Sequence, residues 1–307
     1  MRLISLLPSA TEMIDAMGLS AQLVGISHAC DYPPHLMHLP RVTSCIVPKD
    51  ATSKEIDTVV RTQLEQSSAL YDLDIALLEE LKPDLILTQA LCDVCAVNGE
   101  DVDKAICSLS STPTVVNLEP FTLGEVLDTV TAIGRATGFD ARAATLRQSY
   151  EDRIETVFKR SSRLTDKPKT VVLDWVDPAF VSGHWMHDLI TLAGGVDSMG
   201  TPKTPSWTAS WEEVIAMNPD VLVIACCGFD VERTMTEILG CEATIGLTRL
   251  KEQGCVIHIF DGNALFSRPS LRLVDSLELL AHHLHPNIHP LMPVEGVEKP
   301  VAVHQWQ

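Results

Sequence analysis

A short string that joins a helix to a strand occurs twice in this 307-residue chain, once in each half. The first copy runs from Leu78 to Leu87 around Lys-Pro-Asp, and the second runs from Trp211 to Ala225 around Asn-Pro-Asp. In each copy a Pro-Asp pair precedes a continuous apolar run, which is typical of a buried parallel strand. Recurrence of one unit in the same order predicts two similar α/β halves.

The stretch between the two copies has no strand pattern. Residues 122–165 keep apolar side chains at helical spacing and contain few breakers. The chain is therefore predicted to be α/β, with two Rossmann-like lobes joined by a long bridging helix. We place an N-terminal lobe at 1–121, the bridging helical segment at 122–165, a C-terminal lobe at 166–290 and an irregular tail at 291–307. Loops at the carboxyl ends of parallel strands would face a cleft between the lobes.

The amino terminus illustrates the expected unit. A strand over Arg2–Leu7, a helix ending at Gly18 and a strand over Leu23–Ser27 make a βαβ unit. Ser9 is the expected N-cap of this helix, with Glu12 completing a capping box. Further strands are predicted at 114–118, 170–174 and 255–260, and further helices at 75–81, 102–107, 187–193 and 271–283.

Composition excludes several classes of function. The chain carries 41 acidic against 23 basic residues, a net charge of −18, which disfavours binding to duplex nucleic acid or to an anionic membrane surface. No apolar run approaches the roughly 18 residues of a spanning helix. The nine cysteines form an odd set with an adjacent pair, Cys226 and Cys227, so a disulfide framework is not expected and a reducing compartment suits them better.

The apolar run Leu3–Leu7 is too short for a signal peptide and is followed by Pro8 and Glu12. A cytoplasmic location is therefore expected, or a periplasmic one if a leader has been removed.

Candidate binding residues follow the predicted strands, whereas the common nucleotide and hydrolase motifs are absent from the sequence. In the first lobe the candidates for ligand recognition or coordination are His28, Cys30, Asp31, Tyr32, Gln89, Cys92 and Cys95. Cys92 and Cys95 form a Cys-x-x-Cys, which suits half of a zinc site, a redox pair, or a mixed site with His28 and Cys30. The alternatives are a polar turn and a tight loop of small buried thiols.

In the second lobe the candidates are mostly aromatic. They are Trp175, Phe180, His184, Trp185, Cys227, Phe229, Asp261 and Asn263. Large aromatic side chains in loops can supply flat apolar walls for a large ring-shaped ligand, or they can pack between lobe and loop. Trp211 is expected to pack, and His282, His283, His285 and His289 are expected to serve the end of a helix.

These strings resemble the vitamin B12/iron-siderophore class of ABC-transporter substrate-binding proteins. The opening string Ile4–Glu12 and the junction Leu81–Ile86 are similar to that family's, over roughly residues 2–286. The closer resemblance is to its cobalamin-binding subgroup, through the strings His28–Pro33, Cys92–Val97, Gly183–Trp185, Cys227–Asp230 and Asp261–Asn263.

The resemblance implies the class III periplasmic-binding-protein fold and a non-enzymatic, monomeric carrier or scavenger of cobalamin or a related corrinoid, linked to ABC-type uptake. The ring would lie between aromatic walls, with Gln89, Asp261 and Asn263 at its amides. His28 or His184 would be the axial ligand of cobalt. The partner would be an ABC permease or an intracellular corrinoid-handling protein. Carriers linked to an importer dock their permease through one surface carboxylate on each lobe. In this sequence the first-lobe position holds Ala76, and the second-lobe position holds Glu212.

Two alternatives remain. Cys30, Cys92, Cys95, His28 and Cys227 would converge on zinc or iron in a metal-dependent enzyme or metal-handling protein. Heme or a siderophore complex would be a different ligand for the same kind of carrier.

Overall fold

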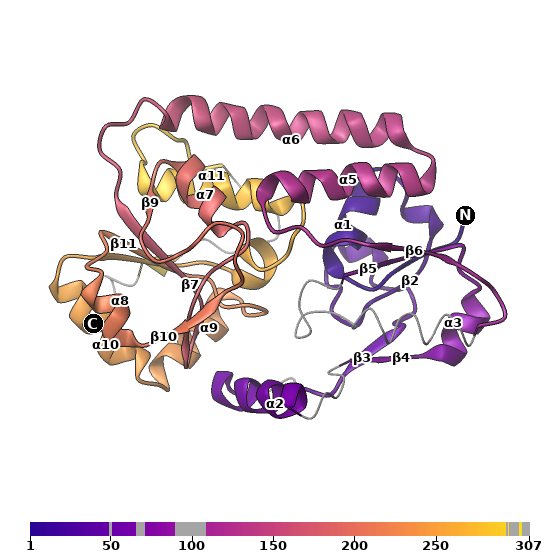
Figure 1. The fold of residues 1–307 in the computed structure, drawn as a ribbon, viewed down its shortest axis with the longest axis horizontal. Helices are drawn as coiled ribbons and strands as arrows, with labels where there is room; N and C mark the ends of the chain where they lie inside the picture. The colour runs from indigo at the N-terminus through magenta and orange to yellow at the C-terminus, as the bar shows by residue number, and fades with distance from the viewer. Residues whose placement is uncertain (49–50, 66–70, 90–108, 293, 295–300, 303–307) are drawn as a thin grey trace. The chain divides into compact units, whose positions relative to one another are not determined.

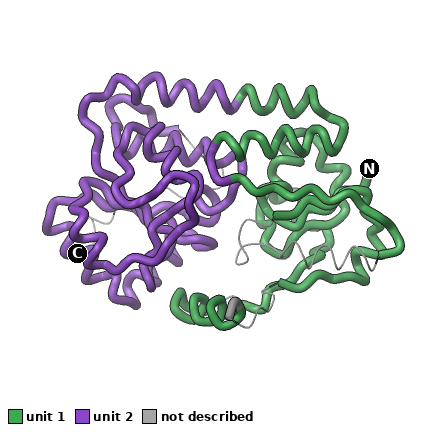
Figure 2. The backbone as a smooth tube through the Cα atoms, in the orientation of Figure 1, with its two compact units in different colours: residues 1–120, 124–149 green, residues 121–123, 150–307 purple. Residues whose placement is uncertain are grey.

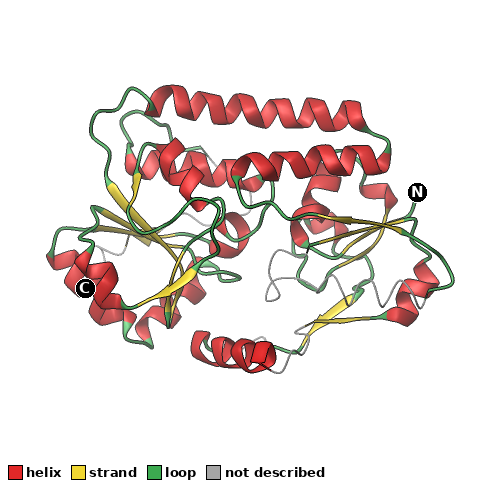
Figure 3. Cartoon of the chain, viewed as in Figure 1, coloured by secondary structure: helices red, strands yellow, loops and turns green. Residues whose placement is uncertain are grey.

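The computed structural model describes residues 1–48, 51–65, 71–89, 109–292, 294 and 301–302. Cys92, Cys95 and the helix predicted at 102–107 lie outside these residues. The chain divides into two compact units (Figure 2), unit 1 with residues 1–120 and 124–149, and unit 2 with residues 121–123 and 150–307. Both units combine helices with a sheet that contains parallel strands (Figure 3), as the sequence predicts.

Unit 1 is built on a four-stranded parallel sheet. Its order is β2-β1-β5-β6, formed by β1 (Leu3–Ser5), β2 (Leu23–Ile26), β5 (Leu85–Thr88) and β6 (Thr114–Asn117). A separate antiparallel pair, β3 (Thr43–Cys45) with β4 (Tyr71–Leu73), was not expected from the sequence. The helical elements are α1 (Pro8–Ala16), η1 (Ser20–Gln22), η2 (Pro34–Leu36), α2 (Ser53–Glu65), α3 (Ile75–Leu81) and α5 (Leu123–Thr137).

The predicted N-cap of α1 is wrong. The helix begins two residues earlier than predicted, at Pro8, and its N-cap is Leu7, which makes no side-chain capping bond. Proline suits the first helical position because its φ is already helical and its missing N–H would have no partner there. Ser9 therefore lies inside the helix.

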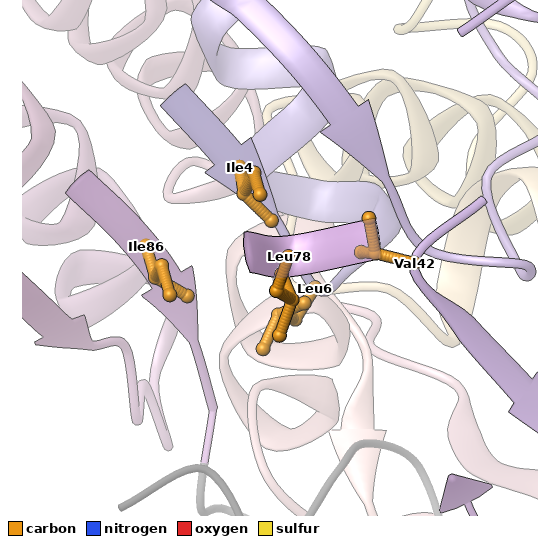
Figure 4. Packing of buried hydrophobic residues seen from close by; sticks show 5 residues of the cluster. All are labelled: Ile4, Leu6, Val42, Leu78 and Ile86. Atoms are coloured by element: carbon orange, nitrogen blue, oxygen red, sulfur yellow. The ribbon is translucent and has the colours of Figure 1, made fainter. Parts of the chain in front are cut away.

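One face of this sheet packs on α3. Ile4, Leu6, Val42, Leu78 and Ile86 form a buried cluster (Figure 4), with Leu78 reaching it from the helix. Alternate residues of an extended chain point to opposite faces, so Ile4 of β1 and Leu6, just after the strand, lie on the same side. This packing fixes α3 and the strand that follows it.

Leu78→Ala is expected to destabilise unit 1 by about 2–5 kcal/mol, because it removes a side chain that is 1% exposed and leaves a cavity. Urea denaturation followed by circular dichroism measures the loss. The matched control is Ile75→Ala in the same helix, where the side chain is 36% exposed, and it is expected to change stability by less than about 1 kcal/mol. Equal losses for the two variants would contradict the packing.

The sequence repeat corresponds to a repeated structure. Lys82 and Asn218, at equivalent positions, both adopt a left-handed backbone with φ of 44° and 45°. The aspartates two residues later repeat the same contacts, because Asp84 accepts a hydrogen bond from the backbone N–H of Arg2 and Asp220 from that of Lys169, each at 2.7 Å. In each unit this aspartate ties the helix-to-strand turn to the start of the neighbouring strand.

Unit 2 contains a mixed seven-stranded sheet. The order is β10-β8-β7-β11-β12-β13, with β9 (Val196–Asp197) also paired to β7. The parallel centre consists of β7 (Lys169–Val176), β11 (Val221–Ile224) and β12 (Val256–Ile259). Three strands run antiparallel to their neighbours: β8 (Ala179–Val181), β10 (Trp207–Ala209) and β13 (Val301–Ala302).

Two sequence expectations differ from this sheet. The segment after Asp174 was predicted to be a loop, but β7 continues to Val176 and turns directly into β8, so Trp175 pairs with Phe180 across a hairpin. Pro178 in the turn separates two short runs that the sequence does not mark as a pair. In the predicted irregular tail, β13 pairs with β12.

The helices of unit 2 lie on both sides of its sheet (Figure 1). They are α7 (Met186–Ala193), α8 (Trp211–Ala216), α9 (Val231–Leu239), α10 (Ala243–Glu252), the π-helical turn η3 (Gly262–Phe266) and α11 (Arg272–Leu284). The long helix α6 (Asp140–Ser161) has residues in both units. Within unit 2 its Arg153 pairs with Asp275 and Glu278 of α11, at 2.5 and 2.8 Å.

Candidate functional site

The carboxyl ends of β7, β11 and β12 lie side by side in unit 2, and the loops that follow them are joined by backbone hydrogen bonds. Cys227 N–H donates to the carbonyl of Asp174 at 2.9 Å, and Asn263 N–H donates to the carbonyl of Phe229 at 3.1 Å. The loop after β12 can approach the loop after β11 because residue 262 is a glycine. A Cβ atom there would lie 2.1 Å from the carbonyl oxygen of Cys226. The three loops therefore form one layer at the ligand-binding edge of an α/β sheet.

Aromatic side chains from two of these segments meet. The rings of Trp175 and Phe229 lie 4.9 Å apart at 41°, and the guanidinium of Arg233 lies 4.0 Å from the Phe229 ring centre. Phe180, opposite Trp175 in the hairpin, is partly exposed. The indole Nε1 of Trp175 is buried and meets no acceptor among the described residues. Phe229 is only 3% exposed, so the accessible apolar part of the layer comes from Trp175 and Phe180, with the guanidinium of Arg233 over the ring of Phe229.

His184 and Trp185 follow β8. The ring of His184 lies 5.3 Å from Phe121 and 5.5 Å from Trp185, and burial lowers the pKa of His184, so its imidazole is neutral at pH 7. Trp185 is buried and donates its indole N–H to the carbonyl of Phe266 at 2.9 Å. Trp185 therefore holds the segment after β8 against η3, whereas the side chain of His184 is the more accessible of the two.

The polar candidates of unit 2 have structural partners. Asp261 caps η3 by accepting a hydrogen bond from Ala264 N–H at 2.7 Å, and burial raises its pKa. Asn263 accepts a hydrogen bond from Arg268 at 2.8 Å. Cys227 is exposed, unlike the adjacent Cys226, whose pKa burial raises strongly.

Asp174 is the most perturbed carboxyl group of this layer. It accepts a hydrogen bond from the Ser206 hydroxyl at 2.6 Å, yet its removal from water dominates and raises its pKa from 3.8 to about 6. Because the folded pKa lies above the unfolded one, the native state binds more protons between about pH 4 and pH 6. The free energy of unfolding must then fall as the pH rises through that window.

Asp174→Asn is expected to remove this dependence. A shift of about two units corresponds to a destabilisation on the order of 2–3 kcal/mol once the carboxyl is charged. Urea denaturation of both proteins at several pH values measures it. The stability of the wild type relative to the variant should decline between about pH 4 and pH 6 and then level off. If the stabilities of the wild type and the variant change in parallel with pH, the raised pKa of Asp174 is contradicted.

In unit 1 the loop after β2 carries four of the predicted residues. His28 Nδ1 lies 2.7 Å from the hydroxyl of Thr43, and its ring lies 5.3 Å from that of Tyr71. Cys30 is buried, with its thiol 3.2 Å from the Thr11 hydroxyl, which fits a structural thiol. The other two residues of this loop are Asp31, which is exposed, and Tyr32, which is half-buried.

Gln89 directly follows β5 and is 5% exposed. It extends the carboxyl edge of unit 1, because β5 pairs with β1 beside β2. Each unit therefore has candidate residues at the carboxyl ends of its own parallel strands.

Three residues of the unit 2 layer were not predicted. Phe121 and Ser206 lie far in sequence from the partners they contact, and no local pattern marks them. Arg233 had a signal, because it lies three residues after Asp230, which caps α9 by accepting a hydrogen bond from Arg233 N–H at 2.8 Å. The first turn of a helix that follows a strand-end loop is a place where side chains reach ligands.

The residues expected to be structural are so placed. Trp211 packs on α10, where a Cβ at Gly246 would lie 2.4 Å from its ring. The histidines near the end of α11 make hydrogen bonds: His282 with the carbonyl of His289, His283 with that of Leu279, His285 with that of Gly194, and His289 with the Ser161 hydroxyl. Within the described residues, no three His, Cys, Asp or Glu side chains are grouped as metal ligands.

Glu212, the candidate docking carboxylate of unit 2, is exposed on α8 and forms an ion pair with Arg249 of α10. Among the residues that the structure describes, no helix has the length and apolar character needed to cross a membrane.

A family model described as periplasmic binding protein matches residues 3–240. The chain belongs to the periplasmic binding protein family. A vitamin B12-binding protein of Vibrio cholerae is 24% identical over 225 residues, which cover 72% of this chain and 69% of that protein.

Solved structures show the same fold. The periplasmic vitamin B12 binding protein BtuF of Vibrio cholerae has a TM-score of 0.65 at 21% identity, covering 92% of this chain and 96% of that one. A periplasmic heme binding protein from Pseudomonas aeruginosa has a TM-score of 0.69 at 17% identity, covering 95% of each chain. The prediction of the class III periplasmic-binding-protein fold is confirmed, and members of the family bind small ligands for transport.

Proposed function

We propose that this chain is a carrier that binds cobalamin or a related corrinoid. The observation that carries the proposal is the layer at the carboxyl ends of β7, β11 and β12, where Trp175 and Phe229 lie 4.9 Å apart beside Arg233. A corrin is a broad, largely apolar ring with amide groups at its edge and a metal at its centre. The layer has groups for the apolar ring and for its edge, and His184, which follows β8, has an imidazole for the metal.

The apolar part of the ring would lie against Trp175 and Phe180, with the buried Phe229 packed against Trp175. Burying an aromatic surface of this size supplies most of the affinity in small-molecule sites, and the polar groups fix orientation. Asp261, Asn263 and Cys227 lie on the same loops and would meet the amide edge. Arg233 would attract an anionic substituent, such as the phosphate of the nucleotide arm.

Unit 1 would contribute through the carboxyl ends of β2 and β5. Tyr32 and Gln89 supply a phenol and an amide there, and His28 supplies an imidazole. Enclosure of the ligand between two lobes, expected from the sequence, remains a prediction, as do the contacts of Cys92 and Cys95.

Titration of the purified chain with aquocobalamin, monitored by absorbance and calorimetry, tests the proposal. We expect one corrinoid per chain, retained through gel filtration. Hemin and a ferric hydroxamate siderophore are the comparison ligands, because relatives of the same fold bind heme. If hemin or the siderophore binds more tightly than aquocobalamin, the proposed ligand is wrong and that compound takes its place. If none of the three binds, the carrier function is contradicted.

A metal-dependent enzyme is the alternative that the sequence leaves open. Its ligand set would need Cys92 and Cys95, outside the described residues, together with Cys30, whose thiol already contacts Thr11. The relatives are binding proteins. Metal analysis of protein purified without a histidine tag tests this alternative, and one stoichiometric zinc or iron lost on Cys92→Ser would support it.

We further propose that the carrier acts as a monomer in a reducing compartment, delivering its ligand to an ABC permease or to a corrinoid-handling protein. Six cysteines of the described part are free thiols. A docking role for Glu212 would require its ion pair with Arg249 to exchange for a cationic partner residue. Gel filtration tests the monomeric state, and cell fractionation tests the compartment. An oxidised, periplasmic protein would contradict the reducing compartment.

A further inference from the structure

The backbone of His184 is held in a strained conformation. Its φ is 53°, in the left-handed region that residues with a side chain rarely adopt. His184 N–H donates to the carbonyl of Thr204 at 2.7 Å, and Gly183 N–H donates to the hydroxyl of Ser206 at 3.0 Å. That hydroxyl in turn donates to the carboxylate of Asp174 at 2.6 Å.

Residues 204–206, here called the strap, lie directly against Gly183. A Cβ atom on Gly183 would be 2.3 Å from the carbonyl oxygen of Thr204 and 2.5 Å from the nitrogen of Ser206. The strap continues into β10, which pairs with β8 just before Gly183. Backbone contacts on both sides therefore determine the conformation of His184, which is the condition under which strain persists at functional positions.

The imidazole that this backbone presents is suited to a metal. Its ring is partly buried and lies 5.3 Å from the ring of Phe121 and 5.5 Å from that of Trp185. Neither ring nitrogen hydrogen-bonds to a described residue, and a neutral imidazole is a common ligand of transition metals. Packing by two aromatic rings limits its rotation.

We propose that His184 coordinates the cobalt of the bound corrinoid and that Ser206, anchored on Asp174, is the positioning residue that fixes His184 for this bond. The inference rests on the proposed function and adds the metal ligand and its support. On binding, an imidazole nitrogen replaces a water at cobalt. The cobalt–oxygen bond breaks, a cobalt–nitrogen bond forms, and water leaves without a change of oxidation state.

Cobinamide is the appropriate probe, because it lacks the nucleotide base and any nitrogen ligand on its axial positions must come from the protein. Diaquocobinamide has exchangeable axial waters, whereas dicyanocobinamide in excess cyanide has both positions blocked. We expect the wild type to bind the diaquo form at least about ten-fold more tightly. After reduction to cobalt(II), electron paramagnetic resonance should show splitting from one nitrogen, altered by nitrogen-15 labelling of the protein.

The variants separate coordination from folding. His184→Ala and Ser206→Ala are expected to lose the preference for the diaquo form and the nitrogen splitting, while dicyanocobinamide still binds. Ser206→Thr, which keeps the hydroxyl, should restore both signals. Thr208→Ala on β10 is the matched control and should retain both, because Thr208 is exposed and makes no side-chain hydrogen bond to a described residue.

Four results would overturn all or part of the inference. If cobalamin binds but bound cobinamide shows no splitting from a protein nitrogen, His184 does not coordinate cobalt, and the proposed function still stands. Loss of the signal in His28→Ala instead of His184→Ala would assign the metal to unit 1. If neither cobalamin nor cobinamide binds, the proposed function fails as well. Retention of both signals in Ser206→Ala would refute the positioning role alone.

Discussion

Trp175→Ala is expected to weaken binding of aquocobalamin by about 30- to 1,000-fold, which corresponds to about 2–4 kcal/mol. The indole ring lies 4.9 Å from Phe229 and opposite Phe180, so its removal takes away part of the apolar surface and leaves Phe229 without its neighbour. Aromatic residues of this kind dominate affinity because they bury a large area with few rotatable bonds. Calorimetric titration measures the effect.

Two controls distinguish the ring from general damage. Trp175→Phe keeps an aromatic ring at the same place and is expected to lose less than about ten-fold in affinity. Trp207→Ala removes an equally large side chain, 38% exposed on β10, and is expected to bind normally. A loss of affinity in Trp207→Ala as large as that in Trp175→Ala would mean that the layer around Phe229 is not the ligand surface.

The two-lobed α/β fold was readable from the sequence because its signals are local. The Lys-Pro-Asp and Asn-Pro-Asp turns recur because each sets a left-handed residue and an aspartate that ties the next strand to its neighbour. Helix α2 was missed because Ser53–Glu65 is polar over most of its length, so its apolar stripe is narrow. The β7–β8 hairpin was missed because β7 was expected to end at Asp174 and the three-residue run of β8 (Ala179–Val181) is too short to stand out on its own.

The unit 2 site could be predicted only in part, for a physical reason. Residues at strand ends share one edge of the sheet, so Trp175, Phe229 and Asn263 could be grouped from the order of strands alone. Ser206 acts on Asp174 across 32 positions, through an antiparallel pairing that the sequence does not mark. The strain at His184 is likewise set by the strap and not by its own neighbours in sequence.

Two residues predicted to contact the ligand, Cys30 and Trp185, are buried in the structure. Cys30 and Trp185 follow strands, as ligand contacts do, but their polar atoms face Thr11 and Phe266. Position at a strand end therefore selects candidates without telling which point outward. That distinction depends on packing against loops that come later in the chain.

Gly262→Ala is expected to destabilise unit 2 by at least about 3 kcal/mol and to abolish corrinoid binding. Its Cβ would lie 2.1 Å from the carbonyl oxygen of Cys226 and 2.5 Å from the carbonyl carbon of Ala225, both backbone atoms at the end of β11. Neither can move without disturbing the bond from Asn263 N–H to the carbonyl of Phe229, so the η3 loop must separate from the β11 loop.

The matched control for this clash is Gly254→Ala, which has a positive φ of 89° but nothing within 4 Å of the added atom. It carries only backbone strain and is expected to lose about 1–2 kcal/mol with unchanged binding. Thermal unfolding and cobalamin titration measure both variants. If Gly262→Ala loses no more stability than Gly254→Ala, the β11 and η3 loops are not packed against each other. The layer that places Phe229 beside Asn263 would then lack its structural basis.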